Sequence, residues 1–223
     1  MRRSSLLAAA GLFLFAACGG GAPSGSQPAG ASVRPGVPTV PPGGVPVSQL
    51  CQGQPTFSLQ TPQPTFASDA ELNARFPAQI AGQAPTDVRS TYWLQTACYF
   101  SGASEDLAEF AAIFPPSTLP LISSGSAAYT IDGDEITISA FRIPGTDPSV
   151  IFTNFPAFLT AFGVEQSEIP LYNVAQANIG GKNVWVVTDP DGDKSYSVVS
   201  GDIVFTANDV TDAQAATIVA AIP

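Results

Sequence analysis

The sequence contains no histidine, and this absence excludes whole classes of catalytic site. Without an imidazole ring, neither a Ser-His-Asp triad nor a Cys-His pair can form. The chain also lacks a G-x-S-x-G nucleophile motif and a glycine-rich phosphate loop followed by lysine. A serine–lysine pair using Lys182 or Lys194 is formally conceivable, but no S-x-x-K motif is present. We therefore expect that the protein is not an enzyme and that it needs no cofactor.

Basic residues are also scarce. Eight Lys and Arg residues stand against 18 Asp and Glu residues, which gives a formal net charge of −10. A chain this acidic is repelled by phosphate backbones, and no basic stripe offsets the repulsion, so we exclude nucleic-acid binding. Charged residues make up only 12% of the chain and apolar residues 45%. That balance is typical of a globular protein rather than a disordered one.

The first 18 residues have the arrangement of a bacterial export signal. Two arginines precede an apolar run, Leu6–Ala17, which is too short to span a bilayer. The run ends in Phe15-Ala16-Ala17-Cys18, which resembles the lipobox of bacterial lipoproteins, although Phe15 stands where leucine is usual. The resemblance implies that residues 1–17 are removed and that Cys18 is acylated. We then expect a membrane-anchored protein of the bacterial cell envelope, facing outward or into the periplasm; an ordinary cleavable signal is the alternative.

Two cysteines remain if Cys18 carries lipid. Cys51 and Cys98 would lie in an oxidising compartment, where a disulfide between them is the simplest interpretation. The long loop that it closes would contribute about 4 kcal/mol in the chain-entropy model. Two free buried thiols are the alternative. A metal site is not expected, because two thiolates without histidine are too few ligands for zinc.

The composition divides the mature chain into two parts. Residues 18–47 are rich in glycine and proline and contain almost no large apolar side chain. Such a segment cannot bury a core, and we expect a disordered tether with an end-to-end distance of about 30 Å. Residues 48–223 then form a single folded domain, held to the membrane through the anchor.

Apolar spacing and turn residues predict the elements of that domain. Helices are expected to begin at four start signals: Ser68–Glu71, Ser104–Asp106, Asp147-Pro148 and Thr211–Gln214. Strands are expected at Val88–Phe100, Ala127–Ile131, Glu135–Ile143, Asn183–Thr188, Lys194–Ser200 and Ile203–Ala207. Tight turns make neighbouring strands antiparallel. The predicted fold class is α+β, an antiparallel sheet with helices packed on one face. A weak internal repeat, in which Ala78–Gly82 corresponds to Ala175–Gly181, is left open.

Three C-terminal motifs carry a family resemblance. They are Gly180–Val184, Thr188–Gly192 and Gly201–Phe205. The chain resembles a group of uncharacterised bacterial lipoproteins that share a G-G-K-x-V strand, a D-P-D-G turn and a G-D-V-x-F strand. The match covers roughly residues 70 to 223 and consists mostly of turn and core residues. It implies a shared fold, and it carries no catalytic residue across.

Acidic clusters are the remaining candidates for chemistry. Asp189, Asp191 and Asp193 alternate in a turn and could ligate calcium, but Gly192 is at the fourth position of the loop rather than the sixth, and Ser200 stands where an EF-hand has a bidentate glutamate. Turn formation is the stronger interpretation. A second acidic cluster consists of Asp132, Asp134 and Glu135. We interpret these as turn residues rather than as the paired catalytic carboxylates of a glycosidase-like site.

Two functions remain open after these exclusions. One is a non-catalytic interaction or structural module of the envelope, with an envelope protein as its partner. The alternative is a lipoprotein that binds a small apolar ligand between its sheet and helices. That alternative needs an enclosed apolar cavity of several hundred cubic ångströms.

Overall fold

The computed structural model describes residues 47–52, 65–101, 113–115, 117–161 and 164–223. The predicted signal peptide, the acylated Cys18 and nearly all of the predicted tether lie outside these ranges. The helix expected to begin at Ser104–Asp106 lies outside them except for its last residues. Within the described ranges, no helix is long and apolar enough to cross a membrane.

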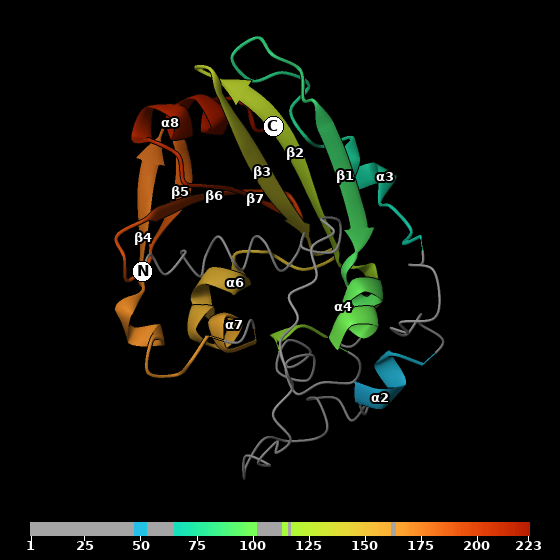
Figure 1. The fold of residues 1–223 in the computed structure, drawn as a ribbon. Helices are drawn as coiled ribbons and strands as arrows, with labels where there is room; N and C mark the ends of the chain where they lie inside the picture. The colour runs from blue at the N-terminus through green and yellow to red at the C-terminus, as the bar shows by residue number, and fades with distance from the viewer. Residues whose placement is uncertain (1–46, 53–64, 102–112, 116, 162–163) are drawn as a thin grey trace, which may run out of the picture.

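One antiparallel sheet of seven strands forms the centre of the domain (Figure 1). Its strands are β1 (Asp87–Tyr92), β2 (Ser123–Ile131), β3 (Asp134–Arg142), β4 (Asn173–Ile179), β5 (Lys182–Thr188), β6 (Lys194–Ser200) and β7 (Ile203–Asn208). The strand order is β1-β2-β3-β7-β6-β5-β4, so β7 returns to pair with β3 in the middle. Strands β1 and β4 are therefore the two edges. The predicted α+β class and the antiparallel sheet are confirmed.

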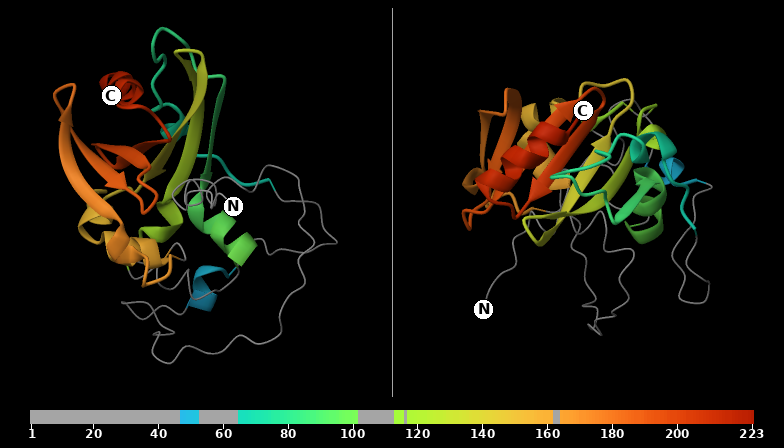
Figure 2. Two further views of the ribbon diagram at one scale, coloured as in Figure 1. Left: turned by 60° about the vertical axis from the view of Figure 1, so that its left-hand side comes forward. Right: turned by 90° about the horizontal axis from the view of Figure 1, so that it is seen from above.

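Short helices cover the sheet. They are α2 (Val47–Leu50), α3 (Ala70–Asn73), α4 (Trp93–Ser101), α6 (Val150–Thr153), α7 (Phe155–Ala161) and α8 (Asp212–Ala221), with 3-10 turns η2 (Leu119–Leu121) and η3 (Ile169–Leu171). The sheet is bent, and α8 lies between its two arms while α6 and α7 lie on the opposite side (Figure 2). We call these two sides the α8 face and the α6 face.

The helices occupy both faces of the sheet, which corrects the expectation that they pack on one. The reason lies in the central strands, which are apolar on both sides. In β7, Ile203 and Phe205 contact the core under α8, whereas Val204 contacts the core under α6. A strand with apolar residues on both faces is shielded from water only when other elements pack on each of those faces.

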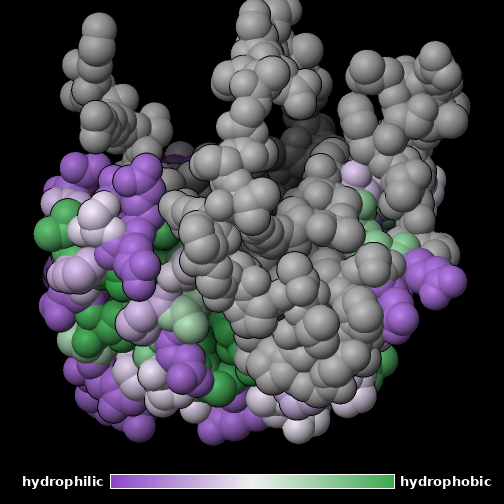
Figure 3. All heavy atoms as spheres, turned by 90° about the horizontal axis from the view of Figure 1, so that it is seen from below, coloured by the Kyte–Doolittle hydropathy of each residue, from purple (hydrophilic) through white to green (hydrophobic). Residues whose placement is uncertain are grey.

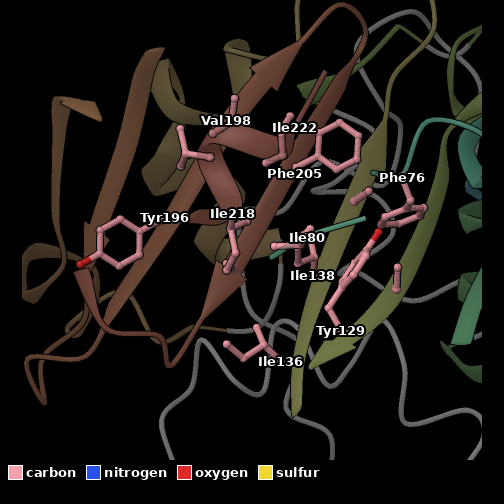
Figure 4. Close-up of a cluster of buried hydrophobic side chains, with 14 of the residues drawn as sticks. Phe76, Ile80, Tyr129, Ile136, Ile138, Tyr196, Val198, Phe205, Ile218 and Ile222 are labelled. Carbon is pink, nitrogen blue, oxygen red and sulfur yellow. The ribbon is translucent and has the colours of Figure 1, made fainter. Parts of the chain in front are cut away.

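The α8 face has a core of buried apolar side chains (Figure 4). Tyr129 and Phe205 are fully buried there, and the rings of Phe76 and Phe205 meet edge to face at 5.7 Å. The hydroxyl of Tyr129 donates to the carbonyl of Pro77 at 2.7 Å, and burial raises the pKa of Tyr129 to about 12. Helix α8 closes this core with Ala215, Ile218, Val219 and Ile222 beyond its end.

The α6 face has a second core, built from α4, α6 and α7. Its members include Trp93, Leu94 and Cys98 of α4, together with Ile151, Phe155 and Leu159. Phe152 of α6 stacks on Trp185 of β5 with ring centroids 4.9 Å apart.

The predicted strand at Val88–Phe100 is wrong over its second half. Strand β1 ends at Tyr92, and α4 begins at the next residue. Trp93, Leu94, Ala97 and Cys98 follow a helical spacing, and all four contact the α6-face core. The Thr and aromatic content of the segment favoured a strand, but burial of this one face favours the helix.

Three other helix predictions fall within the described ranges. Helix α3 is capped by Asp69, whose carboxylate accepts from the backbone N–H groups of Glu71 and Leu72, rather than by Ser68. The helix expected to start at Asp147-Pro148 begins instead at Val150, with Ser149 at the N-cap position. It is interrupted at Asn154, and α7 begins at Phe155 with Pro156 in its first turn. The predicted capping box of α8 is confirmed: the Thr211 side chain accepts from the Gln214 backbone, and Gln214 accepts from Thr211.

Strand β4 is absent from the predicted elements. It pairs with β5 over its whole length and leads into a tight turn, where Gly180 and Gly181 have φ of 59° and 83°. Residues 78–82 form no such strand; only an isolated bridge joins Ile80 to Gln83 across the turn at Ala81 and Gly82. The similarity between the two segments is therefore one of turn geometry.

Candidate functional site

The structure joins Cys51 and Cys98 by a disulfide, as predicted. Their Cα atoms are 5.4 Å apart, and Cys98 lies in α4 with 1% of its surface exposed. The bond holds the segment just after α2 against α4 on the α6 face. It encloses α3, edge strand β1 and the start of α4 in one covalent loop.

Asp189 organises the loop between β5 and β6. This residue is 4% exposed, and its Oδ1 accepts from the backbone N–H groups of Asp191 and Asp193, both at 2.9 Å. Its own backbone N–H donates to the carbonyl of Asp193 at 3.0 Å, and Gly192 adopts a φ of 90°. The carboxylate thus supports the turn from within, as the sequence interpretation of this loop expects.

Asp191 and Asp193 lie exposed on the same loop. In the described part of the chain, no group of three or more His, Cys, Asp or Glu side chains is placed to hold a metal ion. Tyr172, which precedes β4, has a raised pKa because of burial and then because of the negative charges of Asp189, Glu168 and Asp191.

The acidic cluster in the β2–β3 turn is likewise engaged in structure. Asp132 and Gly133 have φ of 55° and 94°, the backbone geometry of a two-residue hairpin turn. Asp134 accepts a hydrogen bond from the side-chain amide of Gln214 at 3.1 Å, which ties this turn to α8. Glu135 is exposed.

Among the described residues, the largest ion-pair network surrounds Arg142, at the end of β3. The guanidinium of Arg142 contacts Asp69 at 3.2 Å, Glu71 at 2.8 Å and Asp202 at 2.9 Å. Asp69 also accepts from the hydroxyl of Ser123 at 2.6 Å. The network therefore joins the start of α3, the start of β2, the end of β3 and the β6–β7 turn.

Electrostatics within this network favour the ionised forms. Burial acts to raise the pKa of Asp69, but hydrogen bonds from Ser123, Leu72 and Arg142 and the positive charge of Arg142 outweigh it, and the pKa is lowered. The pKa of Arg142 is raised, because its bonds to Asp202 and Asp69 outweigh burial. The arrangement suits a structural clamp. The one feature of the sequence that could have indicated this network is an arginine at the end of an apolar strand in a chain with few basic residues.

A second polar group joins β6 to α8. The hydroxyl of Tyr196 donates to the carboxylate of Asp212, and Lys194 contacts the same oxygen at 3.2 Å. The bond from Tyr196, followed by that from Lys194, lowers the pKa of Asp212. Lys182, the other lysine of the domain, donates to the carbonyl of Ile222. These contacts do not place Lys182 or Lys194 beside a serine hydroxyl, as a serine–lysine catalytic pair would require.

Few large apolar side chains of the described residues remain exposed, and one of them lies beside edge strand β4. Among the described residues, the large apolar side chains that remain exposed are Val88 at 37%, Leu121 at 52% and Leu171 at 60%. Leu171 ends η3, two residues before edge strand β4. Seen from below, hydrophobic residues are interspersed with hydrophilic ones on the left, the side of β4 in Figure 1 (Figure 3).

Comparison with protein-family models, curated proteins and solved structures finds no match to this chain.

Proposed function

We propose that this protein is a lipid-anchored, extracytoplasmic and non-catalytic module that interacts with other proteins of the bacterial envelope. The observation that carries the proposal is the pairing of a lipobox-like leader ending at Cys18 with a disulfide between the other two cysteines. Disulfides persist in oxidising compartments and are rare in the cytosol. Membership of the lipoprotein group with the G-G-K-x-V pattern is part of the same proposal.

The roles of the acidic side chains support a non-catalytic domain. Asp69 caps α3 and binds Arg142, Asp189 supports its loop, and Asp212 binds two side chains of β6. A carboxylate that acts as a general acid or base works best with a pKa near the working pH. The resolved shifts of Asp69 and Asp212 go in the opposite direction, below the usual range of a carboxyl group.

Aromatic packing favours an interaction module over an apolar-ligand binder. On the α6 face, Phe152 stacks on Trp185, and Phe155 contacts Tyr172 edge to face at 6.4 Å. On the α8 face, Phe76 meets Phe205. The large apolar side chains that a ligand would contact are used to fill the two cores.

The anchor is tested on the full chain made in a bacterial host. We expect the wild type to fractionate with membranes and its intact mass to equal that of residues 18–223 plus acyl groups. The Cys18→Ala variant removes the acylated thiol and should leave the membrane fraction. A soluble wild-type product that lacks acyl groups would contradict the anchor. That conclusion would hold whether or not Cys51 and Cys98 are joined by a disulfide.

A further inference from the structure

Strand β4 leaves one edge of the sheet open. Its pairing with β5 runs from Asn173 opposite Thr188 to Ile179 opposite Lys182, and β4 is the last strand in the sheet order. In the described part of the chain, no strand or backbone hydrogen bond joins its other side. An open edge presents unpaired N–H and C=O groups and is a template for another strand.

The composition of β4 does nothing to block such pairing. Its sequence, N-V-A-Q-A-N-I, contains no charge, proline or glycine, and its register with β5 is continuous, without a bulge. Natural edge strands are usually protected by one of these devices. The opposite edge is protected in this way, because β1 carries Asp87 and Arg89 and follows Pro85.

We propose that β4 docks against β4 of a second copy of this chain, so that one antiparallel sheet continues across both molecules. The inference adds self-association to the proposed envelope module and rests on that function. A twofold axis at Gln176 would place Gln176 opposite its own equivalent. It would also place Ala175 opposite Ala177 of the second copy.

The centre and the charge of β4 argue for a second copy of the chain. Around Gln176 the sequence reads A-Q-A, so a twofold axis there places alanine opposite alanine; further out, Val174 would face Asn178 and Asn173 would face Ile179, pairs that carry no charge. The strand is also neutral, although the chain has a net charge of −10. Two copies can therefore meet here without directly opposed like charges.

The ends of β4 are complementary as well. The negative charges of Glu168 and the exposed Asp191 act on Tyr172 at the beginning of β4, while Lys182, which also donates to the carbonyl of Ile222, follows the turn at its end. An antiparallel arrangement brings the acidic end of one copy beside the Lys182 end of the other. It also gives Leu171, which is 60% exposed beside this edge, a neighbouring surface to contact.

The test uses full-length chains with their own leader and two different C-terminal tags, co-expressed and co-purified. Wild-type copies should purify together. In the proposed dimer Gln176 faces Gln176 of the second copy. Gln176→Glu in both copies, or Gln176→Lys in both, therefore opposes two like charges and should weaken association by about fivefold or more. One copy with each change should associate again, a result that loss of folding cannot produce.

Val88 on β1 provides the matched control. This exposed edge residue takes the same two changes, Val88→Glu and Val88→Lys, which should leave co-purification at the wild-type level. A Gln176→Cys chain should also form a disulfide-linked dimer, since facing Cα atoms of paired strands lie within disulfide range. Wild-type copies that fail to purify together, or Gln176 variants that behave like wild type, would overturn the proposal. Membrane fractionation of the same cells reports separately on the anchor.

Discussion

Replacing Arg142 by methionine tests whether its ion pairs hold the domain together. The side chain of Arg142 is 14% exposed and that of Asp69 only 3%. Removing one partner of a buried pair leaves an uncompensated charge, which costs about 3–5 kcal/mol. Asp69 retains its bonds from Ser123 and from two backbone N–H groups. Glu71 and Asp202 are 66% and 27% exposed and can be solvated. We therefore expect a loss of about 3 kcal/mol, at the low end of the range.

Urea denaturation of the mature chain with Cys18→Ala measures this loss through the transition midpoint. Arg89→Met is the control, because Arg89 and Asp87 form an exposed pair at 3.6 Å and the change should cost less than about 1 kcal/mol. The double variant Arg142→Met with Asp69→Asn should lose less than the sum of the two single changes. An Arg142→Met chain no less stable than Arg89→Met would refute the reasoning.

The pH dependence supplies an independent check with a defined sign. The folded-state pKa of Asp69 is below its unfolded value, so its contribution to stability is present above about pH 4 and is lost as pH falls through the folded pKa. Without Arg142 the folded pKa of Asp69 rises. The stability difference between wild type and Arg142→Met should therefore shrink as pH falls from about 4. A difference that stays constant to pH 2 would mean that Asp69 is not the group responsible.

Three further changes address the disulfide and the Asp189 loop. Cys51→Ala with Cys98→Ala should lower the free energy of unfolding by about 4 kcal/mol, because the closed loop spans 47 residues; a loss under 1 kcal/mol in urea would show that the bond constrains little. Asp189→Ala should lower it by about 1–2 kcal/mol, since two part-buried hydrogen bonds from backbone N–H groups lose their acceptor. Asp191→Asn with Asp193→Asn should change it by less than about 0.5 kcal/mol, and millimolar calcium should not move the wild-type melting temperature. A rise of several degrees with calcium, lost when all three aspartates become asparagine, would instead identify a metal site.

Local signals in the sequence were sufficient where a few neighbouring residues decide the structure. Thr211 and Gln214 predict the start of α8, because a capping box satisfies backbone donors within one turn. Asp132-Gly133 predicts the β2–β3 hairpin, because its geometry requires positive φ. The pairing of Cys51 with Cys98 followed from the number of cysteines once Cys18 was assigned to lipid. The aspartates of the Asp189 loop were interpreted as turn residues on the same local grounds.

Other features depended on which surfaces meet in the folded chain. Trp93 to Cys98 is helical because one side of the segment is buried in the α6-face core, beside β1, β2 and η2, a choice that Thr and aromatic content could not reveal. Strand β4 lacks the β-branched run of β5 and is ordered by pairing with it. Helices cover both sheet faces because β7 lies in the middle of the sheet, where both of its sides are shielded from water. The Arg142 network joins residues up to 133 positions apart, from Asp69 to Asp202. Sequence patterns record interactions within a turn or a strand, whereas contacts between distant segments arise only when the sheet assembles.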